Sequence, residues 1–396
     1  MRHRSRTASA VSALSVLLVG VVVVSAGIGP VHVGPIAVAK VFANAIAVPA
    51  GVRMEATALA APWHAVEWYA PFGYDVDPLY STIVLQVRLP RIAAGASIGF
   101  ALAASGTVMQ GLFRNPMADP SIIGVSSGAS VGAVAAIVAP VALPFGLGLR
   151  ASAFVGALVA AVVVYAIATE GGRTPVATLL LAGVAVQTFL GSVTSYLILR
   201  SGDSIEEVTY WLMGHLDASR IEEALITGGI SFALVVVLYL YAEDLNALLL
   251  GETDARSVGV EVEWTKRILL AASSIITGAA VAISGVIGFV GLIVPHALRL
   301  IVGPDHRILL PTSALAGASF PVPADTLALS QAVQSILLWS DRAFAEASPL
   351  AVADGVAVLR PEIGEVIRAA YDPVLPASAD DPAHALRLAA RLGRMG

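Results

Sequence analysis

Polar residues between two long apolar stretches, 92–112 and 122–142, and at the start of the second stretch could contact a solute. The sequence there is FRNPMADPSIIGVSSGAS at 113–130, and it contains Asn115, Pro116, Ser126, Ser127 and Gly128. Glycine and serine at the start of a helix leave backbone N–H groups and hydroxyls available to hydrogen-bond a passing molecule. The simpler interpretation is a tight turn, because proline disfavours helix at the residue before it and Asp119 or Ser121 can cap the next helix. The residues alone leave both interpretations open.

Two arginines offer ionic contacts at the start of the first of these stretches. Arg88 and Arg91 lie in the sequence RLPR. A guanidinium group suits bidentate pairing with a carboxylate on another protein. The alternative is anchoring at a membrane interface, where arginine extends its charged end toward water.

A long polar connection at 243–267 is the third candidate site. Most connections are about 4–6 residues long, so this one has room for structure of its own. Its sequence LNALLLGETDARSVGV, 245–260, predicts a short amphipathic element with Leu245, Leu248 and Leu249 near one face. Gly251 interrupts the element, and Glu252, Asp254 and Arg256 supply polar contacts. A plain connecting loop is the alternative.

Residues for covalent or metal chemistry are missing from the sequence. There is no cysteine, no H-E-x-x-H, no G-x-S-x-G and no G-x-x-x-x-G-K-[ST] phosphate loop. His296 follows Pro295 in VPHALRL and could suggest a metal ligand, but a lone histidine near a helix end favours a structural role. We expect no catalysis, no metal site and no cofactor, and any ATP must be bound by another protein. The net charge of −5 does not suggest nucleic acid as a partner.

The composition indicates the elements that position these residues. Of the 396 residues, 57% are hydrophobic and 13% are charged, whereas soluble domains have roughly a quarter charged. The apolar blocks approach the roughly 20 residues of a bilayer-spanning helix. We therefore predict an all-α polytopic bundle in the lipid bilayer, with nine spans at 11–29, 92–112, 122–142, 151–169, 177–199, 224–242, 268–284, 286–302 and 308–329.

The loops between these spans predict the orientation. Arg2, Arg4 and Arg6 precede the first span, and lysine and arginine are more frequent in the loops that this places inside. We expect a cytoplasmic N-terminus, with 31–87 and 200–223 outside and 243–267 inside. A cleaved signal peptide is the alternative for the first segment. The run at 268–303 is too long for one crossing, so we expect it to break at Gly285 and Gly288, beside a translocation path.

Long stretches of the chain resemble the FecCD-type permeases of ABC importers for cobalamin, haem and iron–siderophore complexes. The resemblance covers about 80–328 and includes RLPRIAAGASIGFALAASGTVMQGLFRNPMADPSIIGVSSGASVGAVAA, LNALLLGETDARSVGVEVEWTKR, ISGVIGFVGLIVPHALRL and GPDHRILLPTSALAGAS. It implies a multi-pass protein of the cell membrane with ten spans. The implied partners are a second permease copy, two ABC ATPase subunits and an external substrate-binding protein.

The resemblance also implies roles for residues. It places the ATPase-coupling helices at 245–260, with Leu245, Leu248, Leu249, Gly251, Glu252, Ala255, Arg256 and Gly259. It implies that Arg88 and Arg91 take part in docking of the binding protein. It also matches GGRTPVAT, 171–178, to a cytoplasmic gate. Val176 and Ala177 replace the small hydroxylated residues of that gate. Leu329 stands where the family usually has another external arginine.

The end of the chain departs from the family. Residues 1–328 fit the transmembrane domain, but 329–396 lack an apolar run long enough for a tenth span and carry recurring charges. The two explanations are a shifted reading frame near the end of the gene and a divergent tail. An ion-coupled secondary transporter and a defective permease without its last helix remain alternative functions. The former usually has ionisable residues within its spans, and Asp325 is the only deep acid here.

Overall fold

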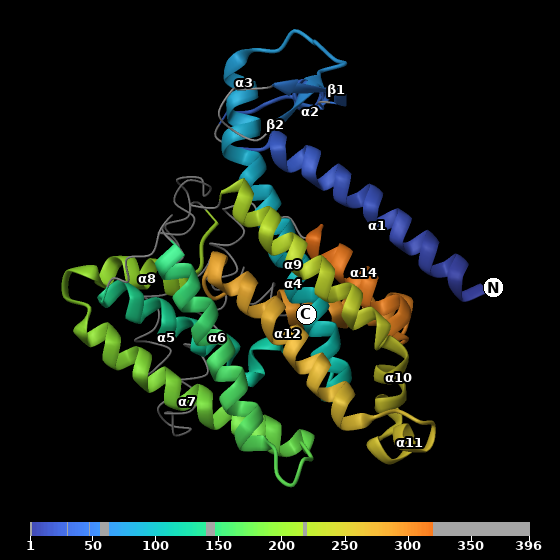
Figure 1. Cartoon of the computed structure of the whole chain (residues 1–396), viewed down its shortest axis with the longest axis vertical. Coiled ribbons are helices and arrows are strands. Elements are labelled where there is room, and N and C mark those ends of the chain that lie inside the picture. Colours follow the sequence, from blue (N-terminus) through green and yellow to red (C-terminus); the bar gives the residue numbers. More distant parts are fainter. Residues whose placement is uncertain are drawn as a thin grey trace, which may run out of the picture. The chain divides into compact units, whose positions relative to one another are not determined.

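The computed structural model describes residues 2–29, 31–46, 48–55, 63–139, 147–216 and 220–319, and nearly all of them are helical. The elements are α1 (Arg2–Gly27), α2 (Pro35–Ala45), β1 (Val48–Glu55), β2 (Trp63–Tyr69), α3 (Pro78–Thr82), the π-helical η1 (Ile83–Arg88), α4 (Leu89–Leu112), the 3-10 turn η2 (Pro120–Ile123), α5 (Val125–Val138), α6 (Leu147–Ala168), α7 (Val176–Arg200), η4 (Gly202–Ser204), α8 (Ile205–Met213), α9 (Ile221–Leu240), α10 (Ala242–Leu250), α11 (Glu252–Ser257), α12 (Val262–Ser284), α13 (Val290–Val302) and α14 (His306–Ala318). Figure 1 shows them along the chain. The predicted all-α membrane bundle is confirmed, with one β-hairpin added to it.

Six of the described helical stretches are long and apolar enough to cross a bilayer. They are Ser9–Gly27, Pro78–Leu112, Gly148–Ala168, Val176–Arg200, Ile221–Leu240 and Val262–Ser284. The spans expected at 122–142, 286–302 and 308–329 correspond to α5, α13 and α14, whose described helices have 14, 13 and 13 residues. These three are shorter than about 20 residues, so the count of nine crossings stays a prediction.

Helices α4 and α12 are the buried helices of the bundle. In each, 72% of the apolar window is buried, against 28% or less in the windows of α1, α6, α7 and α9. Small residues allow this burial, as the glycine- and serine-rich sequence of α4 predicts. A side chain at Gly99 would overlap the backbone of Gly317 in α14, and one at Gly106 would overlap Gly291 in α13.

A hydroxyl pair joins α4 to α12. Ser105 Oγ lies 2.8 Å from Thr277 Oγ1, and both side chains are fully buried. A hydrogen bond between two buried hydroxyls satisfies groups that would otherwise face hydrocarbon. This contact therefore links the buried face of α4 to that of α12.

The segment expected as an external loop, 31–87, contains folded structure. Strands β1 and β2 pair antiparallel, with Val48 opposite Tyr69 and Glu55 opposite Trp63. A small apolar cluster then joins α1 to α2 and η1 through Ala26, Val33, Val38, Val41 and Val84. The sequence predicted only that 31–87 lies outside. The hairpin was not predicted, because its pairing depends on a partner strand that begins eight residues further along the chain.

The predictions for Asp325, Leu329 and the tail 329–396 lie outside the described residues.

Candidate functional site

The predicted coupling segment forms two short helices, α10 and α11, between α9 and α12 (Figure 1). Leu245 and Leu248 are buried and Leu249 is half-buried, so these leucines anchor α10 to the bundle. The exposed apolar residues of the segment are instead Leu250, at 75%, and Val258, at 72%. The amphipathic pattern therefore predicted the helix correctly, but it did not single out the two side chains that are open to a partner.

Two glycines shape this segment. Gly251, between α10 and α11, has φ +134°, and Gly259, after α11, has φ +93°. Residues with a Cβ rarely adopt such values, whereas glycine adopts them without a steric penalty. Between the two, Ala255 is fully buried and its N–H donates to the carbonyl of Gly251 at 2.9 Å. Helix α11 is thus held as a defined short helix rather than as a plain loop.

Lys266 connects α11 to two other parts of the chain. Its side chain is buried, and Nζ lies 2.6 Å from Glu252 Oε1 of α11 and 3.4 Å from Glu263 Oε1 of its own helix. Nζ also donates to the carbonyl oxygen of Thr174 at 2.8 Å. A buried ammonium group has three donors to satisfy, and here each has an acceptor.

Thr174 connects this network to the start of α7. Its backbone N–H donates to Glu263 Oε2 at 3.0 Å, and Pro175 follows as the N-cap of α7. The predicted gate residues Val176, half-buried, and Ala177, exposed, are the first two residues of that helix. The structure therefore brings together the predicted coupling segment and the predicted gate, which are about 75 residues apart in the sequence.

Arg256 lies at the edge of the same network. Its Nη2 is 3.5 Å from Glu252 Oε2 and 3.6 Å from Glu263 Oε1. Both glutamates are therefore shared between the exposed Arg256 and the buried Lys266. Sequence analysis selected Glu252 and Arg256 but missed Lys266 and Glu263, although one signal was available: Lys266 is one of only two lysines in the chain.

A second polar cluster fastens α10 to the start of α14. Asn246 Nδ2 donates to Asp305 Oδ1 at 2.7 Å, and Asn246 Oδ1 accepts the backbone N–H of His306 at 2.9 Å and lies 2.8 Å from its Nδ1. Asp305 also caps α14 by accepting the backbone N–H of Arg307. His306 is buried at 1% exposure, with its ring beside Gly111 of α4.

The surroundings of this cluster shift the pKa values of Asp305 and His306. Hydrogen bonds from Arg307, partly opposed by burial, hold the pKa of Asp305 well below its usual value. Burial, and then the charge of Arg299, lower the pKa of His306 from 6.5 to about 4. His306 is therefore neutral at physiological pH, when its Nδ1–H can donate to Asn246.

The sequence FRNPMADP forms the expected tight turn. Asn115 and Pro116 are exposed, and Asn115 Oδ1 accepts the backbone N–H of Met117 at 2.9 Å. Asp119 Oδ1 accepts the N–H of Ser121 at 2.8 Å and caps η2. From α7, Gln187 Nε2 donates to the carbonyls of Ser121 and Ile122. The turn is thereby fastened to the helix that begins at the predicted gate.

The residues predicted to meet a solute in GVSSGAS separate into two groups. Ser126 and Ser127 are half-buried on α5. Gly128 is buried against α6, where an added Cβ would overlap Gly156. This close approach is typical of helix packing, and the predicted place of Gly128 beside a translocation path stays a prediction.

The break between α12 and α13 lies where Gly285 and Gly288 predicted it. Helix α12 ends at Ser284 and α13 begins at Val290. Gly285 has φ +68°, and a side chain there would overlap the carbonyl of Trp211 in α8. The N–H of His215 donates to the carbonyl of Ser284 at 2.7 Å. The segment after α8 therefore satisfies backbone that leaves the helix.

Arg88 is engaged within the chain. Its Nη1 donates to the carbonyl of Ala26 at 2.6 Å, and its Nη2 donates to the carbonyl of Val31. These are carbonyls at and just beyond the C-terminus of α1, where a cation is favoured by the helix dipole. Arg91, one turn further along, is half-buried. The two predicted docking residues thus have different surroundings.

Comparison with known proteins decides the family. The model of the FecCD transport family matches residues 17–335. The chain belongs to the FecCD transport family. The predicted family is thus confirmed, and within it the chain is a membrane permease of the ABC importer type.

Three similar proteins show how far the likeness extends. The cobalamin import system permease protein BtuC of Halobacterium salinarum is 52% identical over 347 residues, which are 84% of this chain and 93% of that protein. The hemin transport system permease protein HmuU of Yersinia pestis is 42% identical over 250 residues, 62% of this chain and 75% of that protein. A solved inward-facing conformation of a metal-chelate type ABC transporter has a TM-score of 0.63 and 28% identity, and covers 82% of this chain and 90% of that chain.

Membership of the FecCD family weighs against one of the alternatives. The chain is a permease of the ABC importer type, which does not favour an ion-coupled secondary transporter. Its multi-pass helices fit a cell membrane protein.

Proposed function

We propose that this FecCD permease imports a corrinoid, with energy supplied by separate ATPase subunits that bind α10 and α11 on the cytoplasmic side. Two copies would surround the path, and an external binding protein would deliver the substrate. The observation that carries the proposal is the contact of buried Lys266 with both Glu252 of α11 and Thr174 beside α7.

The contacts offer a route from the ATPase to the gate. A partner bound at the exposed Leu250 and Val258 would pull on α10 and α11. Through Lys266 and Glu263, that movement reaches Thr174 and then Val176 and Ala177 at the start of α7. Hydrogen-bonded charge networks between rigid helices carry energetic coupling of this kind.

Helix α7 also has the surface that a second copy requires. Only 22% of its apolar window is buried. Exposed apolar residues include Leu181, Phe189 and Leu199, the last at 82%. A helix with such a surface packs against lipid or another subunit, and the pairing of two permeases would place the two α7 helices along the path.

The choice of a corrinoid rests on similarity. The cobalamin permease of Halobacterium salinarum is 52% identical over 93% of its length, higher than the 42% identity of the hemin permease. Iron citrate, the substrate in the name of a further relative at 38% identity, is a third chemistry to compare.

The experiment is uptake by proteoliposomes. The permease is reconstituted with its ATPase and binding protein, and accumulation of radiolabelled cobalamin, haemin and ferric citrate is measured with and without ATP. We expect ATP-dependent accumulation of cobalamin alone. Accumulation of another compound would reject the corrinoid assignment, and an assembled complex that accumulates none would favour the defective permease.

Two further proposals concern the ends of the chain. We propose a cytoplasmic N-terminus, and a 1–328 transmembrane domain followed by a tail, 329–396, that does not cross the bilayer. Reporter fusions before Arg2 and after Gly396 test both. On nine crossings the two reporters lie on opposite sides of the membrane, so two signals from the same side would reject this arrangement.

A further inference from the structure

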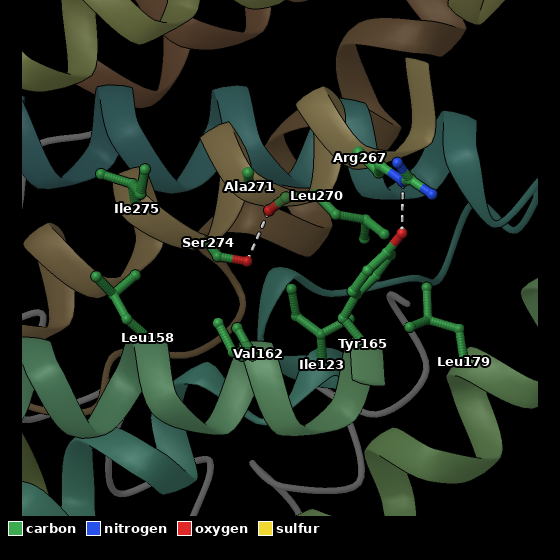
Figure 2. Close-up of a pocket in the computed structure, with 11 residues that line it drawn as sticks. Ile123, Leu158, Val162, Tyr165, Leu179, Arg267, Leu270, Ala271, Ser274 and Ile275 are labelled. Atoms are coloured by element: carbon green, nitrogen blue, oxygen red, sulfur yellow. Dashed lines mark hydrogen bonds between the residues drawn. The ribbon is translucent and has the colours of Figure 1, made fainter. Parts of the chain in front are cut away.

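A cavity of about 410 Å³ lies between α6 and α12, and Leu179, near the start of α7, also lines it. Sites for small ligands have volumes of about 300–1,000 Å³, so this one is large enough for a ligand. Its walls are almost entirely apolar, with Leu158, Ala161 and Val162 from α6 facing Leu270, Ala271 and Ile275 from α12. Figure 2 shows the two helices on opposite sides of this space.

The few polar atoms of the walls are already bonded. Ser274 Oγ donates to the carbonyl of Leu270 in its own helix at 2.6 Å. The Tyr165 hydroxyl accepts a hydrogen bond from Arg267 Nε at 2.9 Å, as the dashed line in Figure 2 marks. A sugar or a nucleotide would lose hydrogen bonds with water in such a cavity and regain few, whereas a hydrocarbon chain loses none.

One end of the cavity carries a positive charge. Arg267 is exposed, and the structure gives it no ion pair among the described residues. It lies near the start of α12, and Tyr165 lies near the end of α6, so both belong to the same edge of the predicted bilayer. Arginine at that depth extends toward lipid phosphates, and basic pockets between helices on the cytoplasmic side suit anionic head groups.

The flank of α6 beside the cavity is also apolar. Val155, Val159 and Val162 are each more than half exposed. An amphiphile with a negative head group therefore matches the site along its whole length, with apolar walls for its chain and Arg267 for its charge.

We propose that this cavity binds one hydrocarbon chain of an anionic membrane lipid, whose phosphate is held by Arg267 with Tyr165 orienting the guanidinium group. The lipid would fill the space between α6 and α12 next to Lys266, and so support the helices that carry the coupling network. The proposal does not depend on which substrate is transported.

Native mass spectrometry of the detergent-purified chain tests the proposal. The protein is titrated with dioleoylphosphatidylglycerol or with dioleoylphosphatidylcholine, and bound lipids are counted. We expect one phosphatidylglycerol to bind about fivefold more tightly than phosphatidylcholine, as one basic residue at a membrane surface gives. Arg267→Gln should abolish this preference. The control Arg173→Gln removes an equal charge from an exposed loop position that does not line the cavity, and should keep the preference.

A second variant tests the hydrocarbon part of the site. Ala271 lines the cavity and is exposed, so Ala271→Phe should be tolerated and should fill the space, weakening both lipids equally. Unchanged preference in Arg267→Gln, or unchanged binding in Ala271→Phe, would overturn the proposal. So would displacement of the lipid by millimolar inorganic phosphate, which indicates a phosphate site. Conversion of a lipid-free dimer to monomers by Ala271→Phe would instead assign this face to the second copy, and would also reject the lipid.

Discussion

At the scale of single residues, Lys266 is the side chain on which the coupling network depends. Its removal leaves Glu252 and Glu263 with only the exposed Arg256, at 3.5 and 3.6 Å, as their shared cation, and leaves the carbonyl of Thr174 without its donor. Removing one member of a buried ion pair costs about 3–5 kcal/mol, and partial exposure of the two glutamates reduces this to roughly 1–3 kcal/mol here. We expect Lys266→Met to lower the midpoint of thermal unfolding in detergent and to reduce uptake more than ATP hydrolysis.

The matched control is Lys40→Met, which removes the only other lysine. Lys40 lies on α2, far from α11 in the sequence, and should leave both measurements near the wild type. Equal effects of the two substitutions on uptake relative to hydrolysis would contradict a coupling role for Lys266.

The buried His306 makes stability depend on pH. Its pKa is lowered from 6.5 to about 4, first by burial, so below pH 6.5 the unfolded chain binds a proton that the folded chain does not. The free energy of unfolding should therefore fall as the pH decreases from 6.5 to 4, by about 2–3 kcal/mol, because one pKa unit corresponds to about 1.4 kcal/mol. Above pH 6.5 this contribution is fully present.

Unfolding midpoints between pH 4 and 8 measure this effect. His306→Gln cannot titrate in this range, so its midpoint should change less with pH than that of the wild type. Parallel pH profiles for the two proteins would show that other groups dominate.

The two arginines of RLPR should respond differently to charge reversal. Arg88→Glu removes the donors to the carbonyls of Ala26 and Val31 and places a negative charge at the C-terminus of α1, so we expect a loss of stability of about 1–3 kcal/mol. Arg91→Glu should instead weaken association with the binding protein at low salt, with an effect that decreases as salt rises.

Thermal unfolding without the binding protein and affinity measured at two salt concentrations separate these effects. If Arg91→Glu binds with unchanged affinity at low salt, Arg91 is an interfacial anchor and the docking prediction is wrong for this residue.

At the scale of the elements, the contact of α5 with α6 distinguishes packing from transport. A Cβ at Gly128 would overlap Gly156, so Gly128→Ala must separate the two helices, at a cost of about 1–3 kcal/mol. The control is Gly191→Ala in α7, where no atom lies within 4 Å of the added Cβ and the loss of glycine flexibility should raise stability by about 0.4–1 kcal/mol. If Gly128→Ala is stable and changes substrate selectivity, Gly128 acts in the translocation path and not in helix packing.

At the scale of the whole molecule, the proposed function requires a separate ATPase subunit. The chain belongs to a transport family, and its α10 and α11 expose Leu250 and Val258. We expect the purified chain to hydrolyse no ATP and the complex with a nucleotide-binding subunit to do so. If the isolated chain still releases phosphate from ATP after contaminating ATPases are removed, the proposal that a separate subunit hydrolyses ATP is wrong.

The sequence by itself determined the class of protein and the positions of most elements. Apolar blocks of bilayer length require helices, since helices satisfy backbone groups in lipid internally, and the breaks at Gly251 and Gly285 follow from a residue that tolerates positive φ. Family motifs then indicated where a coupling segment and a gate would lie, and these two roles stay predictions. The class of protein and the helix breaks depend on local sequence, so no long-range contact was needed to predict them.

The tertiary structure decided which of those residues act together. Leu248 faces the bundle while Leu250 faces outward, Gly128 packs against α6, and Arg88 caps α1, and none of these is fixed by neighbours in the sequence. Lys266 joins Glu252 to Thr174, and Arg267, the next residue, points instead to Tyr165 and the α6–α12 cavity. Adjacent residues on a helix point about 100° apart. Each therefore meets a different segment of the chain, and only the packing of the helices brings those segments to them.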